Sequence, residues 1–160
     1  MNVLVTGGAG YIGSELIDYL LKDGYKVVAI DNLMYDPTSL LRYTNDPNFT
    51  FIKGDVRNVA LMTKLMNDAD IVIPLAALVG FPLCEDDPRS AQEINHDVNT
   101  WIAQTKREDQ KVIYPCTNSG YGVSVDGSVC TEESPLNPIS LYGRTKVAAE
   151  KEYQKVDNHV

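Results

Sequence analysis

The stretch Val3-Leu-Val-Thr-Gly-Gly-Ala-Gly-Tyr-Ile-Gly13 decides the fold. Its apolar start predicts a buried parallel strand, and glycines at 7, 10 and 13 follow where a helix begins. This spacing permits a tight turn, lets a diphosphate approach the main chain, and lets the helix pack closely on the sheet. The helix N-terminus then offers unpaired N–H groups and a positive dipole end to phosphates. The stretch therefore predicts a diphosphate site; the alternative is a glycine-rich turn without a ligand.

The rest of the chain alternates between strand and helix patterns. Apolar runs predict strands at 3–5, 27–30, 49–52, 70–75 and 112–114. Periodic apolar positions predict helices from Gly13 to Gly24, from Asn58 as N-cap to 66, at 91–102 and at 141–150, with a short helix at 40–43. Loops are expected at 78–88 and 123–140, and a turn at 36–39. This alternation predicts an α/β fold with a doubly wound parallel sheet, the Rossmann fold.

Length and composition narrow the class of protein. The 160 residues are expected to form one domain, 1–160, and the net charge of −8 argues against nucleic-acid and membrane-surface partners. No apolar run is long enough to span a bilayer. A strand at the N-terminus without a basic region predicts no signal peptide, and three scattered cysteines fit a reducing cytoplasm. Without metal-ligand spacing among cysteines and the two histidines, no metal site is expected.

Further candidate contacts follow successive strands at their carboxyl ends, where ligands of open parallel sheets bind. Asp31 ends the second strand, so its carboxylate is placed to accept both ribose hydroxyls of an adenosine. It would repel a 2′-phosphate, which favours NAD over NADP; the alternative is a turn cap. Asp55 follows the third strand and is placed to meet the adenine amino group. Ala76 and Ala77 are small enough to let a cofactor lie against the main chain.

A tyrosine–lysine pair supplies candidate acid–base chemistry. Tyr142 and Lys146 are four residues apart, so a helix places them on one face. An ammonium beside a phenol is expected to lower the tyrosine pKa and make it a general base near neutral pH. Thr117, at the end of the fifth strand, is placed to hydrogen-bond the same substrate oxygen. Taken alone, such a pair has an alternative interpretation as two surface residues. It becomes a specific sign of catalysis only in a chain that also has the N-terminal phosphate loop and a hydroxyl residue after a strand.

Together these motifs resemble the extended short-chain dehydrogenase/reductase superfamily, over essentially the whole chain. The branch they resemble most is the NAD-dependent nucleotide-sugar epimerase/dehydratase family. Two stretches, Leu75-Ala-Ala-Leu-Val-Gly80 and Tyr114-Pro-Cys-Thr-Asn-Ser-Gly-Tyr-Gly122, are similar to a subgroup with GDP-heptose C4-dehydrogenases and UDP-glucose 4-epimerase-like enzymes. The resemblance implies NAD as cofactor, a UDP- or GDP-linked sugar as substrate, and a homodimer.

The resemblance also implies a role for each matching residue. Tyr142 is expected to take the proton from a sugar hydroxyl, at C4, while hydride passes to the nicotinamide. Lys146 is expected to bind the nicotinamide ribose and tune Tyr142, and Thr117 to orient the sugar. The implied pyrophosphate contacts are Gly7, Gly10, Tyr11, Ile12 and Gly13. The residues implied to hold the adenosine ribose are Asp31 and Asn32, and those implied to flank adenine are Asp55 and Val56. The nicotinamide side is implied to be lined by Leu75, Ala76 and Ala77, and Asn95 matches the family's cofactor-side asparagine.

Four departures from the family pattern qualify these expectations. Asn118-Ser119 follows Thr117 where 4,6-dehydratases have Asp-Glu for removing water, so dehydration is not expected. Cys116 replaces a usual serine and is expected to pack without being reactive, and Gly120 replaces a usual valine. We also expect the chain to lack the family's C-terminal substrate domain and to be a truncated NAD-binding domain. The alternative to an active epimerase or dehydrogenase is a catalytically silent NAD-binding module; a purely structural domain would leave these motifs unexplained.

Overall fold

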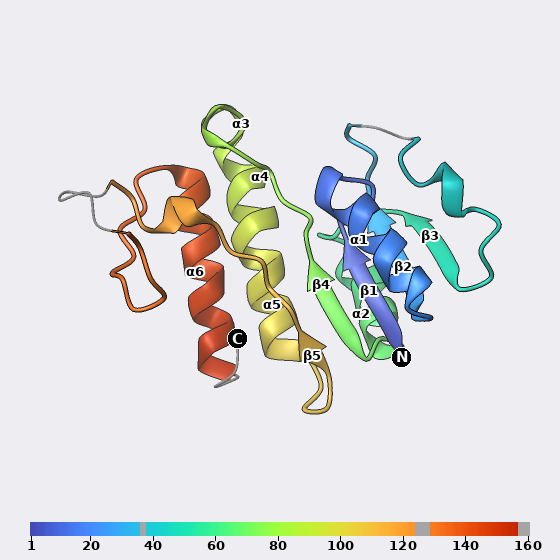
Figure 1. Ribbon diagram of the computed structural model, residues 1–160. Coiled ribbons are helices and arrows are strands. Elements are labelled where there is room, and N and C mark those ends of the chain that lie inside the picture. The colour runs from blue at the N-terminus through green and yellow to red at the C-terminus, as the bar shows by residue number, and fades with distance from the viewer. Residues whose placement is uncertain (36–37, 124–128, 157–160) are drawn as a thin grey trace. The chain divides into compact units, whose positions relative to one another are not determined.

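The computed structural model describes residues 1–35, 38–123 and 129–156 (Figure 1). The first half of the predicted 36–39 turn and residues 124–128 of the predicted 123–140 loop lie outside the described residues. The chain divides into two compact units. The first is Met1–Ala76 with Thr105–Pro115, and the second is Ala77–Gln104 with the described part of Cys116–Val160. One NAD-binding domain over 1–160 stays a prediction.

The first unit contains a parallel sheet in the order β3-β2-β1-β4-β5. The chain steps outward from β1 to β3 and then returns past β1 to β4, which is the doubly wound topology that the sequence predicts. Because crossovers between parallel strands are right-handed, this reversal places α1 and α2 on opposite faces of the sheet, as Figure 1 shows. The bounds are β1 Asn2–Thr6, α1 Tyr11–Lys22, β2 Lys26–Asp31, η1 Leu41–Tyr43, β3 Phe49–Lys53, α2 Val59–Asn67, β4 Ile71–Pro74 and β5 Lys111–Val112.

The sequence signals explain the core and the helix ends of this unit. β1 lies between β2 and β4, and Val3, Leu4 and Val5 are buried, as a strand covered on both faces requires. Asn58 caps α2, since its side-chain oxygen accepts a hydrogen bond of 3.1 Å from the amide of Leu61. β5 is shorter than the predicted 112–114 strand, although the amide of Ile113 still donates to the Val72 carbonyl at 3.0 Å.

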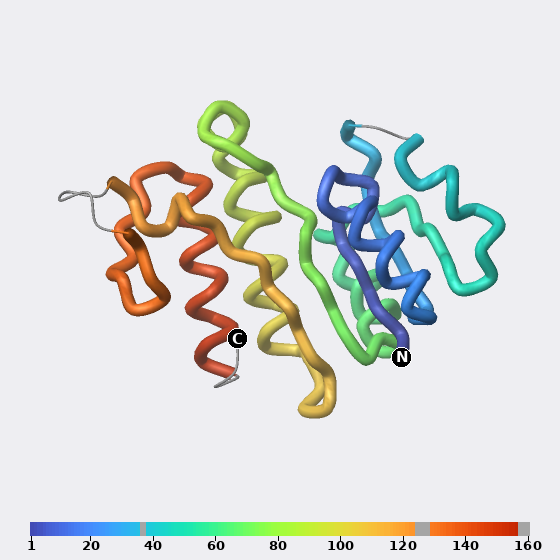
Figure 2. Tube along the Cα trace, viewed as in Figure 1, coloured from blue at the N-terminus to red at the C-terminus, as the bar shows by residue number. Residues whose placement is uncertain are grey.

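The second unit is made of helices. The tube in Figure 2 shows the chain running from the end of β4 into this helical part. The bounds are α3 Phe81–Asp86, α4 Pro88–Gln92, the π-helical turn η2 Glu93–Asp97, α5 Val98–Thr105, η3 Asn118–Gly120 and α6 Leu141–Val156. Helix α6 contacts α3, α4, η2 and η3. No helix in the described ranges is both long and apolar enough to cross a membrane.

Two predictions for this helical part are corrected by the structure. The predicted loop 78–88 contains α3, and the helix predicted from Ala91 begins at Pro88. The signal for the earlier start is Asp87 before Pro88: the Asp87 carboxylate accepts a hydrogen bond of 3.0 Å from the Ser90 amide, and proline is favoured at the first helical position. The predicted period of 3.6 also gave no indication of the π turn at η2.

Candidate functional site

The glycine-rich loop passes directly over the end of β4. Gly7 has φ +67°, and a Cβ there would lie 2.6 Å from the Ala76 amide nitrogen; a Cβ on Gly13 would lie 2.5 Å from the Gly7 carbonyl oxygen. Only glycine fits such contacts. Among the described residues no side chain caps the start of α1, and Tyr11 is 91% exposed. The first amides of α1 therefore have no side-chain cap, which leaves them available to bind an anionic group. Contacts from this loop to a pyrophosphate stay predictions.

Asp31 connects this loop to the turn after β2. One carboxylate oxygen accepts a hydrogen bond of 3.0 Å from the Ala9 amide, and the other accepts one of 2.8 Å from the Leu33 amide. Leu33 itself has a left-handed conformation with φ +60°. The Asn32 side chain is used locally as well, because its oxygen accepts from the Met34 amide at 3.0 Å. Contacts of Asp31 and Asn32 to a ribose stay predictions.

Asp55 lies beside Asp31, since the Gly54 amide donates to the Asp31 carbonyl at 3.0 Å. Its carboxylate accepts from Arg57 Nε at 2.9 Å and from Nη2 at 2.7 Å. These hydrogen bonds from Arg57 lower the pKa of Asp55, against the opposing effect of partial burial. The sequence did not anticipate this ion pair. A contact from Asp55 or the buried Val56 to adenine stays a prediction.

Thr6 is a positioning residue that sequence analysis missed. It is buried at the end of β1, and its hydroxyl oxygen accepts a hydrogen bond of 3.1 Å from the Ala76 amide. Its carbonyl also accepts from the Leu75 amide at 3.1 Å. Thr6 therefore holds the segment predicted to line the nicotinamide side. The available signal was a polar residue at the end of an otherwise apolar strand.

The second unit carries the candidate acid–base residues. Tyr142 and Lys146 stand one turn apart on α6, as predicted, and Thr117 begins η3 with its hydroxyl oxygen accepting from the Ser119 amide at 3.2 Å. Burial raises the pKa of Tyr142 above its ordinary value, and the neighbouring Thr117 hydroxyl offsets part of that rise. The expected lowering of the tyrosine pKa by Lys146 is therefore wrong in direction here, because removal from water outweighs other influences on the phenol.

Lys146 is only 5% exposed. Burial lowers the pKa of its ammonium group to about 8, while the nearby Cys116 and Glu150 act in the opposite direction. Burial and a hydrogen bond to Glu150 raise the pKa of the Cys116 thiol to about 11. Cys116 is therefore protonated near neutral pH, which agrees with the expectation that it is not reactive. At neutral pH Lys146 is still mostly charged, with Glu150 one turn further along the same helix.

Gly143, between Tyr142 and Lys146, is a second position that sequence analysis missed. A Cβ there would lie 3.0 Å from the Ser119 carbonyl oxygen and 3.1 Å from Pro138. The Ser140 hydroxyl oxygen accepts from the Gly143 amide at 3.0 Å and so caps the first turn of α6. The glycine brings this turn, and with it Tyr142, close to the segment that follows Thr117. A glycine inside a predicted helix was the available signal.

Asn95 is fully buried in the π turn. Its side-chain oxygen accepts a hydrogen bond from the Leu78 amide, and its side-chain nitrogen donates to the Leu78 carbonyl, both at 2.9 Å. Asn95 therefore fixes the main chain directly after Ala77. Its predicted role beside the cofactor stays a prediction, and the observed contacts give it a route to act through Leu78.

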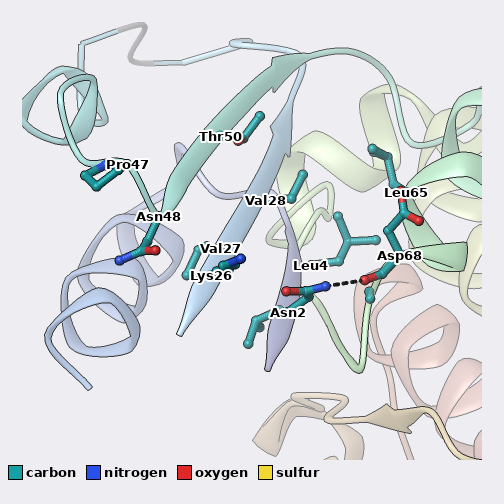
Figure 3. A pocket seen from close by; sticks show the side chains of 12 residues that line it. Asn2, Leu4, Lys26, Val27, Val28, Pro47, Asn48, Thr50, Leu65 and Asp68 are labelled. Carbon is teal, nitrogen blue, oxygen red and sulfur yellow. Dashed lines mark hydrogen bonds between the residues drawn. The ribbon is translucent and has the colours of Figure 1, made fainter. Parts of the chain in front are cut away.

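A small pocket lies at the amino ends of the strands, whereas the glycine-rich loop follows the carboxyl end of β1 (Figure 3). It encloses about 240 Å³ at the amino ends of β1, β2 and β3, which is below the roughly 300 Å³ at which ligand pockets usually begin. None of the predicted site residues lines it. Within the described ranges no group of three or more His, Cys, Asp or Glu side chains is placed to hold a metal ion. The candidate residues therefore lie in two places that are described separately: the carboxyl ends of the strands in the first unit and helix α6 in the second.

Residues 3–159 match the model of the NAD dependent epimerase/dehydratase family. The chain belongs to this family. It is 34% identical over 155 residues to the low-salt glycan biosynthesis protein Agl12 of Haloferax volcanii, covering 94% of this chain and 50% of that protein. It is 32% identical to the UDP-glucose 4-epimerase of Lactobacillus helveticus, covering 94% and 46%. It thus spans about half the length of these curated relatives.

A solved structure gives the same result for the fold. The UDP-glucuronic acid 4-epimerase of Bacillus cereus, crystallised with UDP-glucuronic acid and NAD, matches with a TM-score of 0.87 and 31% identity, covering 97% of this chain and 52% of that one. The family resemblance, the Rossmann-type parallel sheet and NAD as the family's cofactor are therefore confirmed. The narrower likeness to GDP-heptose C4-dehydrogenases stays a prediction.

Proposed function

We propose that this chain forms the NAD-binding and acid–base part of an NAD-dependent enzyme that oxidises a hydroxyl group, at C4, of a nucleotide sugar. Return of the hydride to the other face of the keto sugar gives epimerisation, and its retention gives a dehydrogenase. The observation that carries the proposal is the arrangement of Tyr142 and Lys146 one turn apart on α6, with the Thr117 hydroxyl beside the phenol.

Each side chain has a role that its chemistry supports. Tyr142 removes the proton of the sugar hydroxyl, and Thr117 hydrogen-bonds the same oxygen and orients it. Lys146 carries a charge at neutral pH and binds the nicotinamide ribose. The open start of α1 and the glycine-rich loop hold the diphosphate, and Asp31 holds the adenosine ribose. Bound NAD supplies the hydride acceptor.

The substrate class rests on the relatives and on one departure from the family pattern. Two of the relatives above, the enzymes of Lactobacillus helveticus and Bacillus cereus, are named for epimerisation of UDP-sugars, which supports a UDP-linked sugar. A GDP-linked sugar is proposed from the subgroup resemblance alone. Asn118 and Ser119 offer no carboxyl group after Thr117, so the acid and base needed to remove water are missing there. We therefore propose epimerisation or oxidation in place of dehydration. We also propose a homodimer, which analytical ultracentrifugation would test.

Turnover is the direct test. The chain is incubated with NAD and with UDP- or GDP-linked sugars, and NADH absorbance and epimeric products are followed for the native chain and for Tyr142→Phe. We expect keto-sugar or epimer formation by the native chain, with loss of turnover but unchanged NAD binding in the variant. NAD binding without turnover on any of these sugars would favour the silent module. Equal turnover by both proteins would overturn the role of Tyr142.

A further inference from the structure

The helix that carries Asn95 has an unusual centre. Between α4 and α5 the turn η2, Glu93–Asp97, is π-helical, so its hydrogen-bond ladder is shifted relative to an α-helix. Such turns cost stability and are frequent at functional sites. The Asn99 side chain compensates locally: its nitrogen donates to the Asn95 carbonyl at 3.1 Å and to the Ile94 carbonyl at 3.3 Å. Asn99 is 2% exposed, so water does not replace these contacts.

The oxygen of the same amide group reaches a different helix. Asn99 Oδ1 accepts a hydrogen bond of 2.9 Å from the hydroxyl group of Tyr153, which lies on α6 and is 3% exposed. Burial raises the pKa of Tyr153, so its hydroxyl group remains a donor throughout the physiological range. The Asn99 side chain therefore uses both of its polar ends, one on the π turn and one on α6.

A second connection joins the π turn to α6 nearer the acid–base residues. Asn95 makes two hydrogen bonds to Leu78, one through its side-chain oxygen and one through its side-chain nitrogen. The same nitrogen also lies 3.5 Å from the Thr145 hydroxyl oxygen. Thr145 is buried, directly precedes Lys146, and bonds the Leu141 and Tyr142 carbonyls at 3.0 Å. The π turn thus contacts α6 at Thr145 through Asn95, and α5 contacts α6 two turns later, at Tyr153, through Asn99. We call Asn95, Asn99, Thr145 and Tyr153 the α6 lock.

A buried polar network of this kind acts on position more than on total stability. Apolar side chains pack nearly equally well after a small slide or rotation of a helix, whereas a buried hydrogen bond is lost and leaves an unpaired group. We propose that Asn99 and Tyr153 are positioning residues that set the place of α6, and hence of Tyr142 and Lys146, relative to the Ala77–Leu78 segment. This inference rests on the proposed function for its consequence in catalysis, but not for its geometry.

The experiment follows Lys146 in the chain without cofactor or substrate. Lysine carrying an isotope label is titrated by NMR in the native chain and in Tyr153→Phe, with Lys146→Arg used to assign the signal. In the native chain we expect a midpoint near the pKa of about 8 for Lys146. Loosening α6 hydrates the ammonium group, so the midpoint in Tyr153→Phe should rise by about one pH unit, the equivalent of one modest hydrogen bond. Cys116 and Glu150, which face Lys146, are unchanged in all of these proteins.

Ala149→Gly is the matched control. Ala149 is buried on α6, makes no side-chain hydrogen bond, and its change to glycine weakens the helix without touching the α6 lock. It should lower the melting temperature by a few degrees and leave the Lys146 midpoint in place. An unmoved midpoint in Tyr153→Phe would overturn the positioning role and leave Tyr153 as a structural contact.

A double variant keeps the test decisive if Tyr153→Phe folds poorly. Asn99→Leu combined with Tyr153→Phe removes both partners, so no buried amide oxygen is left unpaired. Because the Ile94 and Asn95 carbonyls also lose the Asn99 nitrogen, this variant is titrated with an osmolyte such as TMAO, which strengthens burial and keeps the chain folded. The positioning role requires the Lys146 midpoint to stay raised in this double variant; a return to the native value would contradict it. Absence of turnover or NAD binding would count against the proposed function alone, because the titration uses neither ligand.

Discussion

The carboxylate of Asp31, at the end of β2, accepts a hydrogen bond of 3.0 Å from the main-chain amide of Ala9 in the glycine-rich loop. Its other oxygen accepts from the Leu33 amide at 2.8 Å. One side chain therefore shapes both the predicted phosphate site and the turn beside the predicted ribose site. This relationship gives Asp31 two separable effects on cofactor binding, one through its oxygens and one through its charge.

Asp31→Ala removes the oxygens and the charge, whereas Asp31→Asn keeps one acceptor oxygen. Loss of hydrogen bonds to a charged group should weaken NAD binding by Asp31→Ala roughly tenfold to a hundredfold. Asp31→Asn should lose less NAD affinity and gain affinity for NADP, because the charge that repels a 2′-phosphate is gone. Titration calorimetry with both nucleotides measures this. Unchanged NAD affinity in Asp31→Ala would contradict the assignment.

Gly7→Ala should strongly destabilise the fold. A Cβ would lie 2.6 Å from the Ala76 amide nitrogen, and the residue has φ +67°. Gly24→Ala is the matched control, since Gly24 has φ +81° but nothing within 4 Å of an added Cβ. The control should cost about 1–2 kcal/mol for the left-handed conformation, and Gly7→Ala should cost clearly more. Urea unfolding measures the difference, and equal losses would show that the loop shifts easily.

Asn95→Ala tests the two hydrogen bonds between the Asn95 side chain and the main chain of Leu78. The change leaves the Leu78 amide and carbonyl without their side-chain partners, which should cost about 2–4 kcal/mol of unfolding free energy. Gln92→Ala, at an exposed position of the same helix, should stay within about 0.5 kcal/mol of the native chain. Denaturant unfolding compares the two variants. A negligible loss in Asn95→Ala would mean that other groups take over at Leu78.

Lys146→Met should change how stability depends on pH. Burial holds the pKa of Lys146 near 8 in the folded chain, below its ordinary value of 10.5. Between these values the unfolded chain binds more protons, so the contribution of Lys146 to stability rises with pH there and is unfavourable below pH 8. Lys146→Met should therefore raise stability below pH 8 by on the order of 3 kcal/mol. This gain in stability should fade as the pH rises toward 10.5. Melting curves of the native chain and of Lys146→Met across this pH range measure it. A stability difference that does not change with pH would contradict the lowered pKa of Lys146.

Cysteine alkylation tests the pair formed by Cys116 and Glu150. Cys130 is exposed and should react first with iodoacetamide, whereas Cys116, with a pKa of about 11, should react slowly near neutral pH. Glu150→Gln removes a carboxylate that raises the pKa of the thiol, so it should accelerate alkylation at Cys116 and leave Cys130 unaffected. Peptide mass spectrometry reads both sites. An unchanged rate at Cys116 would show that burial alone protects it.

Local rules account for most of what the sequence predicted correctly. The structure confirms three features that depend on short segments only. These are the strand β1 from an apolar run, the close main-chain approach at Gly7 and Gly13, and the cap of α2 at Asn58. The order of the sheet followed as well, because right-handed crossovers leave few topologies for alternating strands and helices. Asp87 and Pro88 also carry a local signal for the start of α4 at Pro88.

The fold class, the family and the choice of candidate residues can be predicted from residue order alone, since these depend on patterns within single segments. The contacts that those residues make become known only from the folded chain. The π turn at Asn95, the ion pair of Asp55 with Arg57, and the hydrogen bond from Tyr153 to Asn99 all depend on three-dimensional packing. The direction of the Tyr142 pKa belongs here too. A spacing of four residues brings a lysine near a tyrosine, but burial, which no local pattern specifies, decides which protonation state is favoured.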